Sequence, residues 1–207
     1  MQKISLFLLC TALSALPALA QTPPLADPAP AAVPSYVGDR MRKPPDYRDW
    51  IYLSAGLDMS YNAGQAPDHH MFGNVFVDPA AYRAFRRSGT WPDKTTIVLE
   101  MRGARGSGSI NRRGLYQDGD VMGLEVHVKD EARFPGMWAF FAFDGDAPAR
   151  MIPTSANCYA CHAAHAAVDT TFVQFYPTLL PLATARGTLS AAYLQDAAAA
   201  AAAAAAR

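Results

Sequence analysis

Short stretches of apolar and aromatic residues recur along the middle of the chain with the two-residue period of β-strands. They span residues 50–57, 72–77, 95–102, 121–128 and 137–143. The third stretch divides into two alternating sets of residues, which are Ile97, Leu99 and Met101 against Val98, Glu100 and Arg102. The fourth divides likewise, into Leu124, Val126 and Val128 against Glu125, His127 and Lys129. Because successive side chains point to opposite faces of a sheet, each strand is expected to bury one face.

One helix is expected between the second and third strands. Asp78 is suited to cap its N-terminus, Pro79 to occupy its first position and Gly89 to end it. Tyr82 and Phe85 then share one helical face. The residues that follow the third strand, 103–114, are rich in glycine and arginine, and we interpret them as a solvated hairpin loop rather than an anion site.

The first twenty residues have the pattern of a cleavable secretory signal. Lys3 precedes an apolar run that ends in Ala18, Leu19 and Ala20. We therefore expect export and a periplasmic mature protein that starts at Gln21. The run is too short to cross a bilayer comfortably, and no later segment reaches the roughly 18 apolar residues of a membrane helix, so no membrane span is expected.

Composition divides the rest of the chain into three parts. Residues 21–45 are rich in Pro and Ala without a period, which predicts a flexible leader. Residues 46–182 carry the strand patterns and are expected to form one domain. Residues 183–207 form an Ala-rich tail, in which 197–206 are all alanine and predict a frayed helix without a packing surface.

Charge and cysteine content reduce the number of possible functions. The chain has 18 basic and 18 acidic residues, and cleavage would remove Lys3, which leaves one excess negative charge. No nucleic-acid partner is expected, because such binding needs a basic surface. Cleavage would also remove Cys10, so that Cys158 and Cys161 would be the cysteines of the mature protein.

The most informative motif is Cys158-Tyr159-Ala160-Cys161-His162. On a helix, positions i, i+3 and i+4 lie on one side, so two thiols can reach the vinyl groups of a haem while the imidazole reaches its iron. This spacing predicts one covalently attached haem c, bound through Cys158 and Cys161, with His162 as the iron ligand. Strands that precede a haem-bearing C-terminal helix predict an α+β fold.

Other uses of these two cysteines fit less well. A thioredoxin-type redox pair would be expected in a βαβ setting, whereas residues 144–157 before the motif have the character of a loop. A zinc site would need two further ligands, for which the other histidines are the candidates. A plain disulfide in an oxidising compartment is the simplest alternative.

An ordered set of weaker motifs resembles the cytochrome P460 family over residues 44–177. The set consists of Tyr47-Arg48-Asp49-Trp50, Phe72-Gly73-Asn74-Val75-Phe76-Val77, Trp91-Pro92-Asp93, Val126-His127-Val128-Lys129-Asp130 and Gly136-Met137-Trp138, followed by the haem motif. The resemblance implies a mainly antiparallel sheet packed with helices, a homodimer, and a five-coordinate haem with an open distal side. Members either oxidise hydroxylamine with a lysine cross-linked to the haem, or lack that bond and bind nitric oxide, as the cytochromes c′-beta do.

The first hypothesis is an enzyme that oxidises hydroxylamine or nitric oxide. It requires a lysine near the porphyrin and a carboxylate to accept protons. Lys94 is the lysine candidate, because Lys43 lies in the leader and Lys129 is expected to be solvated; a role in the turn alone is the alternative for Lys94. The candidate carboxylates are Glu100, Asp118, Asp120 and Glu125, and each of these is also suited to be an ordinary surface charge.

The second hypothesis, which we prefer, is a protein that binds nitric oxide or another small nitrogen ligand without turnover. It requires an apolar distal pocket, for which the candidates are Met71, Phe72, Leu99 and Met101. A third hypothesis is electron transfer with a periplasmic partner. It requires a sixth ligand to iron, and the candidates are Met59, Met71, Met101, Met122 and His127.

Overall fold

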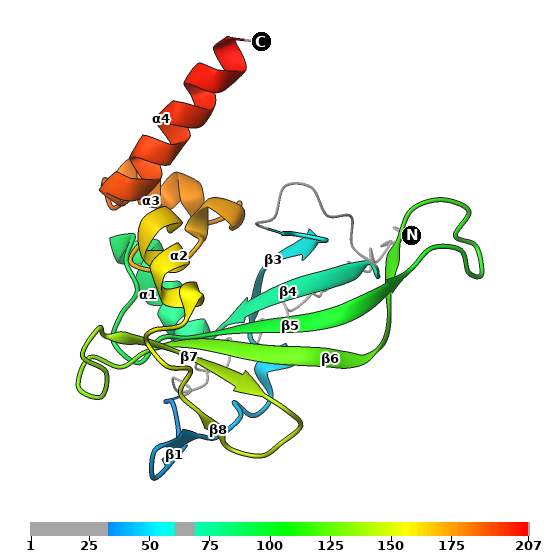
Figure 1. The fold of residues 1–207 in the computed structure, drawn as a ribbon, viewed down its shortest axis with the longest axis horizontal. Helices are drawn as coiled ribbons and strands as arrows, with labels where there is room; N and C mark the ends of the chain where they lie inside the picture. The colour runs from blue at the N-terminus through cyan, green and yellow to red at the C-terminus, as the bar shows by residue number, and fades with distance from the viewer. Residues whose placement is uncertain (1–32, 61–68, 207) are drawn as a thin grey trace, which may run out of the picture.

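The computed structural model of the chain describes residues 33–60 and 69–206, so the predicted signal peptide lies outside the described residues. The fold is α+β, as predicted (Figure 1). Its centre is an antiparallel sheet in the strand order β3-β4-β5-β6-β7. These strands are β3 (Ile51–Leu57), β4 (Met71–Val77), β5 (Thr96–Arg105), β6 (Tyr116–Lys129) and β7 (Trp138–Phe143). All five predicted strands are therefore confirmed. The loop between β5 and β6 covers residues 106–115 rather than the predicted 103–114, because residues 103–105 extend β5.

Two strands of a second, small sheet lie inside the segment predicted as a flexible leader. Its strands, in spatial order, are β1 (Tyr36–Val37), β2 (Arg40–Met41) and β8 (Ala149–Arg150). Met41 is 1% exposed, and the ring of Tyr36 contacts Phe134 and Phe141. The predicted boundary between leader and folded domain, at residue 45, is thus too late in the sequence. Strands of two residues have no periodicity that could distinguish them from the surrounding Pro- and Ala-rich sequence.

Helix α1 (Pro79–Ser88) has the predicted ends. The Asp78 carboxylate accepts hydrogen bonds from the backbone N–H groups of Ala80 and Ala81, at 3.1 and 2.9 Å. Gly89 closes the helix with φ at 79°, a conformation in which glycine avoids the strain of a side chain.

The other helices follow β8. They are α2 (Asn157–His165), α3 (Leu180–Arg186) and α4 (Ala191–Ala205), and the 3-10 turn η2 (Val173–Phe175) lies between α2 and α3. A further 3-10 turn, η1 (Tyr47–Asp49), precedes β3. The predicted tail begins too early at residue 183, because Ala183 is fully buried and Leu189 and Tyr193 pack against the core. Polyalanine is helical as predicted, and α4 extends away from the body of the molecule (Figure 1). No helix within the described residues is both long and apolar enough to cross a membrane.

The two faces of the sheet carry separate cores. On one face, Val77 and Ile97 of the sheet pack against Phe85 of α1, against Trp91 and against residues of α3. On the opposite face, the N-terminal segment packs on Val98, Val126 and neighbouring residues. The predicted alternation in the third and fourth strands is therefore confirmed, but the expectation that each strand buries only one face was wrong, because residues on both faces are buried.

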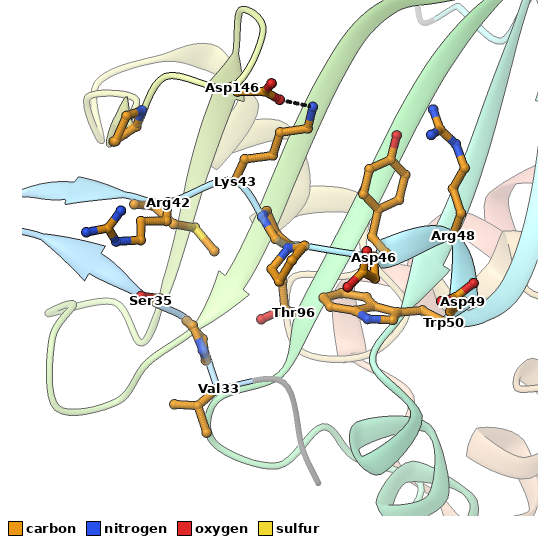
Figure 2. A pocket seen from close by; sticks show the side chains of 16 residues that line it. Val33, Ser35, Arg42, Lys43, Asp46, Arg48, Asp49, Trp50, Thr96 and Asp146 are labelled. Atoms are coloured by element: carbon orange, nitrogen blue, oxygen red, sulfur yellow. Dashed lines mark hydrogen bonds and ion pairs between the residues drawn. The ribbon is translucent and has the colours of Figure 1, made fainter. Parts of the chain in front are cut away.

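A large open hollow of about 720 Å³ lies on the side of the N-terminal segment. Figure 2 shows Lys43 reaching across it to Asp146, at 2.8 Å. Tyr47, Arg48 and Thr96 also line it, but no cysteine or histidine does. The chemistry predicted from the haem motif must therefore lie elsewhere.

Candidate haem-binding site

A cavity of about 510 Å³ lies between the other face of the sheet and the segment containing α2 and η2. Cys158, Cys161 and His162 all line it, so the three residues of the motif are brought to one space as predicted from their helical spacing. Both thiols are free and partly exposed. Part of the remaining lining is apolar and comes from alternate residues of the sheet strands: Val75, Ile97, Leu99, Met101 and Phe140.

The ring of His162 is held through one of its two nitrogens, and the other has no hydrogen-bond partner among the described residues. Its Nδ1 lies 2.7 Å from the backbone oxygen of Thr170. A carbonyl can only accept a hydrogen bond, so Nδ1 carries the proton and Nε2 keeps its lone pair. Burial lowers the pKa of His162, against the opposing effect of the Thr170 bond, so the imidazole is neutral at pH 7. Neutral imidazole is the form that binds iron.

Aromatic residues fix the orientation of the His162 ring and of the helix that carries it. The rings of Phe172 and Phe140 lie 4.1 and 4.6 Å from the imidazole, between ring centroids. The hydroxyl of Tyr159, between the two cysteines, donates to the Ile152 carbonyl at 3.0 Å and accepts from the Phe140 N–H at 3.2 Å. Tyr159 therefore ties α2 to β7 and places the motif against the cavity.

The family follows from comparison with known proteins. The sequence model of the family described as Cytochrome P460 matches residues 44–173, which is more than half of the chain. The chain belongs to the cytochrome P460 family. Membership makes it a haem cytochrome, and the match covers the strands and the motif that build the cavity. No individual curated protein matches the chain.

The cavity of this cytochrome P460 protein suits a largely apolar group such as a haem. Gly56 of β3 and Gly73 of β4 pair across the ladder, and both line the cavity. A Cβ atom at Gly56 would lie 2.1 Å from the sulfur of Met59, and one at Gly73 would lie 3.0 Å from Leu99. Glycine inside a strand often marks a place where a ligand approaches the backbone closely. The residues present therefore fit the group that the family implies.

Three of the four predicted distal residues line the cavity. Met71, Leu99 and Met101 do so, whereas Phe72 does not. Met71 and Phe72 are consecutive in β4, and consecutive residues of a strand point to opposite faces. The prediction that Phe72 lines the same pocket as Met71 was therefore wrong.

The two predicted catalytic candidates lie outside the cavity. Lys94 has φ at 66° in the turn before β5, and its ammonium pairs with Asp130 and lies 3.6 Å from Asp93. Glu100 points to the opposite face of the sheet, where its carboxylate pairs with Arg48 at 2.7 Å and accepts a hydrogen bond from Tyr47. Neither residue is part of the cavity lining.

A different carboxylate reaches the cavity. Glu125 of β6 lines it and is exposed; among the described residues it makes no ion pair. Glu125 was one of the four candidate proton acceptors among which the sequence did not decide. Its alternation with Leu124 and Val126 was the sequence signal that could have placed it on the other face of the strand. Gly56 and Gly73 were not predicted as site residues, although glycine inside a strand pattern was a usable signal.

A disulfide or a zinc site at the cysteine pair finds little support in the geometry. Cys158 and Cys161 are not bonded to each other. Among the described residues, no group of three or more His, Cys, Asp or Glu side chains is placed to hold a metal ion. A zinc site of the usual four protein ligands would require such a group.

Proposed function

We propose that this cytochrome P460 protein is exported, carries one haem c bound through Cys158 and Cys161, and binds nitric oxide or a related small nitrogen ligand. His162 is the protein's ligand to the iron in this proposal. The observation that carries it is the cavity that both free thiols line together with His162, whose Nδ1 donates to the Thr170 carbonyl and whose Nε2 has no partner in the part of the chain that the structure describes. Bound there, the haem would supply an iron centre with an open side for the ligand.

The positions of the lysines support a haem without a lysine cross-link. Apart from Lys3 in the predicted signal peptide, the chain has only Lys43, Lys94 and Lys129. The ammonium groups of these three residues pair with Asp146, Asp130 and Asp169 respectively, and none of the three lysines lines the cavity.

The apolar sheet side of the cavity supports binding of a neutral diatomic ligand. Ile97 and Leu99 of β5 offer no hydrogen-bond donor or acceptor, and Met101 offers only a weakly accepting sulfur. Such a surface admits an uncharged ligand without requiring a hydrogen-bonding partner, and it disfavours water.

One observation favours hydroxylamine oxidation as a second candidate function. Glu125 lines the cavity, and its carboxylate is suited to accept the protons that hydroxylamine loses on oxidation. The enzyme hypothesis therefore rests on Glu125 in place of Glu100. Oxidation of hydroxylamine would then take place without a lysine in the cavity lining.

Electron transfer remains a third candidate, because three thioethers line the cavity. Met59, Met71 and Met101 are all part of its lining. His127 is placed differently: its ring centroid is 5.2 Å from that of His162, and its Nε2 lies 3.2 Å from the Thr170 hydroxyl. It is thus a neighbour of His162 rather than a ligand facing it. A periplasmic redox partner and a homodimer also belong to the proposal, and rest on the signal pattern and the family resemblance.

One set of measurements tests the proposal. Extraction with acid and organic solvent should leave haem on the unaltered chain, and replacing both Cys158 and Cys161 with Ala should release it. The ferrous spectrum should be that of a five-coordinate, high-spin haem, and it should change on addition of nitric oxide. Freely extractable haem would refute covalent attachment, and a six-coordinate, low-spin spectrum would favour electron transfer.

Lys94→Ala tests the absence of a cross-link. The absorption spectrum of the variant should match that of the unaltered protein, because Lys94 is held in a turn by Asp130. Lys43→Ala, which removes a lysine from the opposite side of the sheet, is the matched control. A spectral band lost in Lys94→Ala but kept in the control would establish the cross-linked enzyme instead.

A further inference from the structure

The turn that follows α2 is fixed in the core at its base. Val168 and Thr171 pair with each other across a two-residue turn formed by Asp169 and Thr170. Both residues of the base are 1% exposed. Asp169 has φ at 51°, which is the left-handed region that Asp and Asn tolerate better than most other residues.

Thr170, at the tip of this turn, contacts two imidazoles. Its backbone oxygen accepts from Nδ1 of His162 at 2.7 Å, and its hydroxyl lies 3.2 Å from Nε2 of His127. The His127 ring in turn stacks on Phe140, with 4.0 Å between ring centroids. The position of one residue therefore determines the hydrogen bond of the candidate iron ligand.

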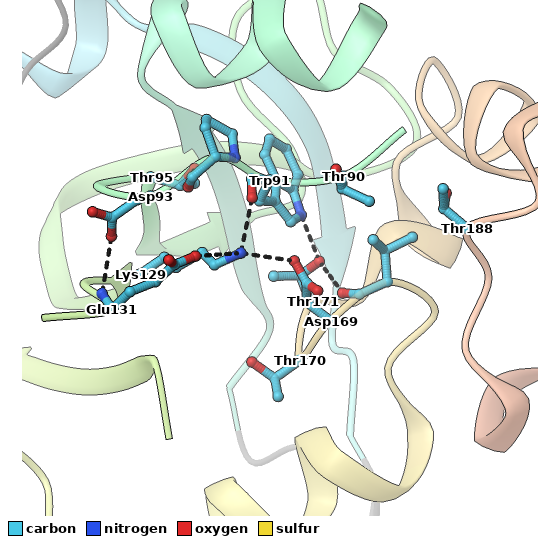
Figure 3. A network of polar contacts seen from close by, with 12 residues as sticks. Thr90, Trp91, Asp93, Thr95, Lys129, Glu131, Asp169, Thr170, Thr171 and Thr188 are labelled. Atoms are coloured by element: carbon cyan, nitrogen blue, oxygen red, sulfur yellow. Dashed lines mark hydrogen bonds and ion pairs between the residues drawn. The ribbon is translucent and has the colours of Figure 1, made fainter. Parts of the chain in front are cut away.

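Lys129 anchors the residue before Thr170. Its ammonium donates to the Trp91 carbonyl at 2.9 Å and lies 3.4 Å from Glu131 and 3.7 Å from Asp169 (Figure 3). The Lys129 side chain is only 9% exposed, so the expectation that it is solvated was wrong. Burying an ammonium group is unfavourable unless partners compensate, and these three oxygens do so.

Trp91 anchors the residue after Thr170. Its indole N–H donates to the Thr171 hydroxyl at 2.8 Å, and that hydroxyl donates to the Val168 carbonyl at 2.8 Å. Trp91 is 2% exposed and also receives the bond from Lys129. Both neighbours of Thr170 are thus tied to one network (Figure 3).

We propose that Lys129 and Asp169 are positioning residues that set the hydrogen bond between Thr170 and His162, and through it the reduction potential of the haem. The inference rests on the proposed ligation of iron by His162. A hydrogen bond from the far nitrogen of a ligating imidazole makes the ligand more basic. A more basic ligand favours ferric iron, so a displaced Thr170 carbonyl should raise the reduction potential.

The test compares the holoprotein with its Asp169→Asn variant. Asn keeps the size of the side chain and tolerates the positive φ, but it removes the charge that faces Lys129. The variant should raise the reduction potential and lower the ferrous iron–histidine stretching frequency measured by resonance Raman spectroscopy. The expected shift is on the order of tenfold in the equilibrium constant for one-electron reduction, about 59 mV. Asp169→Glu, which restores the charge, should move both values back toward those of the unaltered protein.

Lys43→Met is the matched control, because it breaks a lysine–aspartate pair on the opposite side of the sheet. It should leave both values unchanged. A folded Asp169→Asn variant with an unchanged potential and stretching frequency would overturn the inference. Absence of any iron–histidine band from the unaltered protein would instead overturn ligation by His162, and this inference with it.

Discussion

Leu99 of β5 pairs directly with Glu125 of β6, and both side chains line the cavity. An apolar residue and a carboxylate thus stand side by side on the sheet face that looks toward Cys158 and His162. The pair allows the two leading functions to be distinguished by experiment. Binding of a neutral ligand requires only the apolar surface that Leu99 provides, whereas oxidation of hydroxylamine requires a proton acceptor such as Glu125.

Glu125→Gln should leave nitric oxide binding nearly unchanged. Under the preferred hypothesis, the amide keeps the shape of the side chain and the ligand has no proton to give up. Under the enzyme hypothesis, loss of the proton acceptor should reduce hydroxylamine-dependent turnover by roughly 10²- to 10⁴-fold. Stopped-flow binding of nitric oxide and steady-state oxidation of hydroxylamine measure the two outcomes.

Asp120→Asn is the matched control for this substitution, because Asp120 is exposed on the same strand and does not line the cavity. It should affect neither measurement. Rapid hydroxylamine oxidation that disappears in Glu125→Gln but persists in Asp120→Asn would favour the enzyme over the binder.

Gly73→Leu should reduce the haem content of the purified protein. A Cβ atom at Gly73 already lies 3.0 Å from Leu99, and the rest of a leucine side chain would project into the cavity. Haem per polypeptide, measured as the pyridine haemochrome, reports the loss. Gly136→Leu is the control, because a Cβ atom there meets nothing within 4 Å. Equal haem content in both variants would contradict the placement of the haem against β4.

Local sequence signals predicted the framework of the fold. Asp78, Pro79 and Gly89 act at the ends of one helix, and the period of each major strand is contained within the strand. Strands β1, β2 and β8 were missed because two residues carry no period. Their pairing depends on contacts such as that between Arg40 and Arg150, which are far apart in the chain.

The site was predictable only in its local part. Cys158, Cys161 and His162 are close in sequence, so their helical spacing was enough. Choosing Glu125 over Glu100 required knowing which face of the sheet is turned toward the helices. Alternation along a strand separates its two faces but does not show which of them lines the site. The contact of Thr170 with His162 depends on a turn whose shape is set by buried contacts to Trp91.

Glu100 should stabilise the fold in a pH-dependent way without affecting the haem. Burial alone would raise the pKa of Glu100, but hydrogen bonds from Arg102, Tyr47 and Arg48, together with the charge of Arg102, outweigh burial and hold the pKa below its usual value. A carboxyl with a lowered folded-state pKa contributes stability above its unfolded pKa of about 4.3, and loses it as pH falls through the folded value.

The free energy of unfolding of Glu100→Gln should therefore lie below that of the unaltered protein at pH 7. The difference should shrink as the pH falls below about 4. Urea denaturation across this pH range measures it, and Asp120→Asn serves again as the exposed control. The absorption spectrum of the haem should stay unchanged, because Glu100 does not line the cavity. A difference that is constant with pH would contradict the role of the ionised carboxylate.

The last helix should be dispensable only in its outer part. Removing residues 197–207 should change the free energy of unfolding by less than about 1 kcal/mol, because the alanines at 197–206 are exposed. Removing residues 187–207 also deletes Leu189 and Tyr193, which pack on the core, and should cost about 2–5 kcal/mol.

The longer deletion should also disturb the region around the haem motif. Ser190 donates from its hydroxyl to the Ala166 carbonyl at 2.6 Å and from its backbone N–H to the Ala167 carbonyl at 2.8 Å. These two bonds hold the segment that leads from α2 to the turn of Thr170, so their loss should lower the haem content. The shorter deletion keeps Ser190 and serves as the control. Full haem content after both deletions would show that α2 holds its position without support from α4.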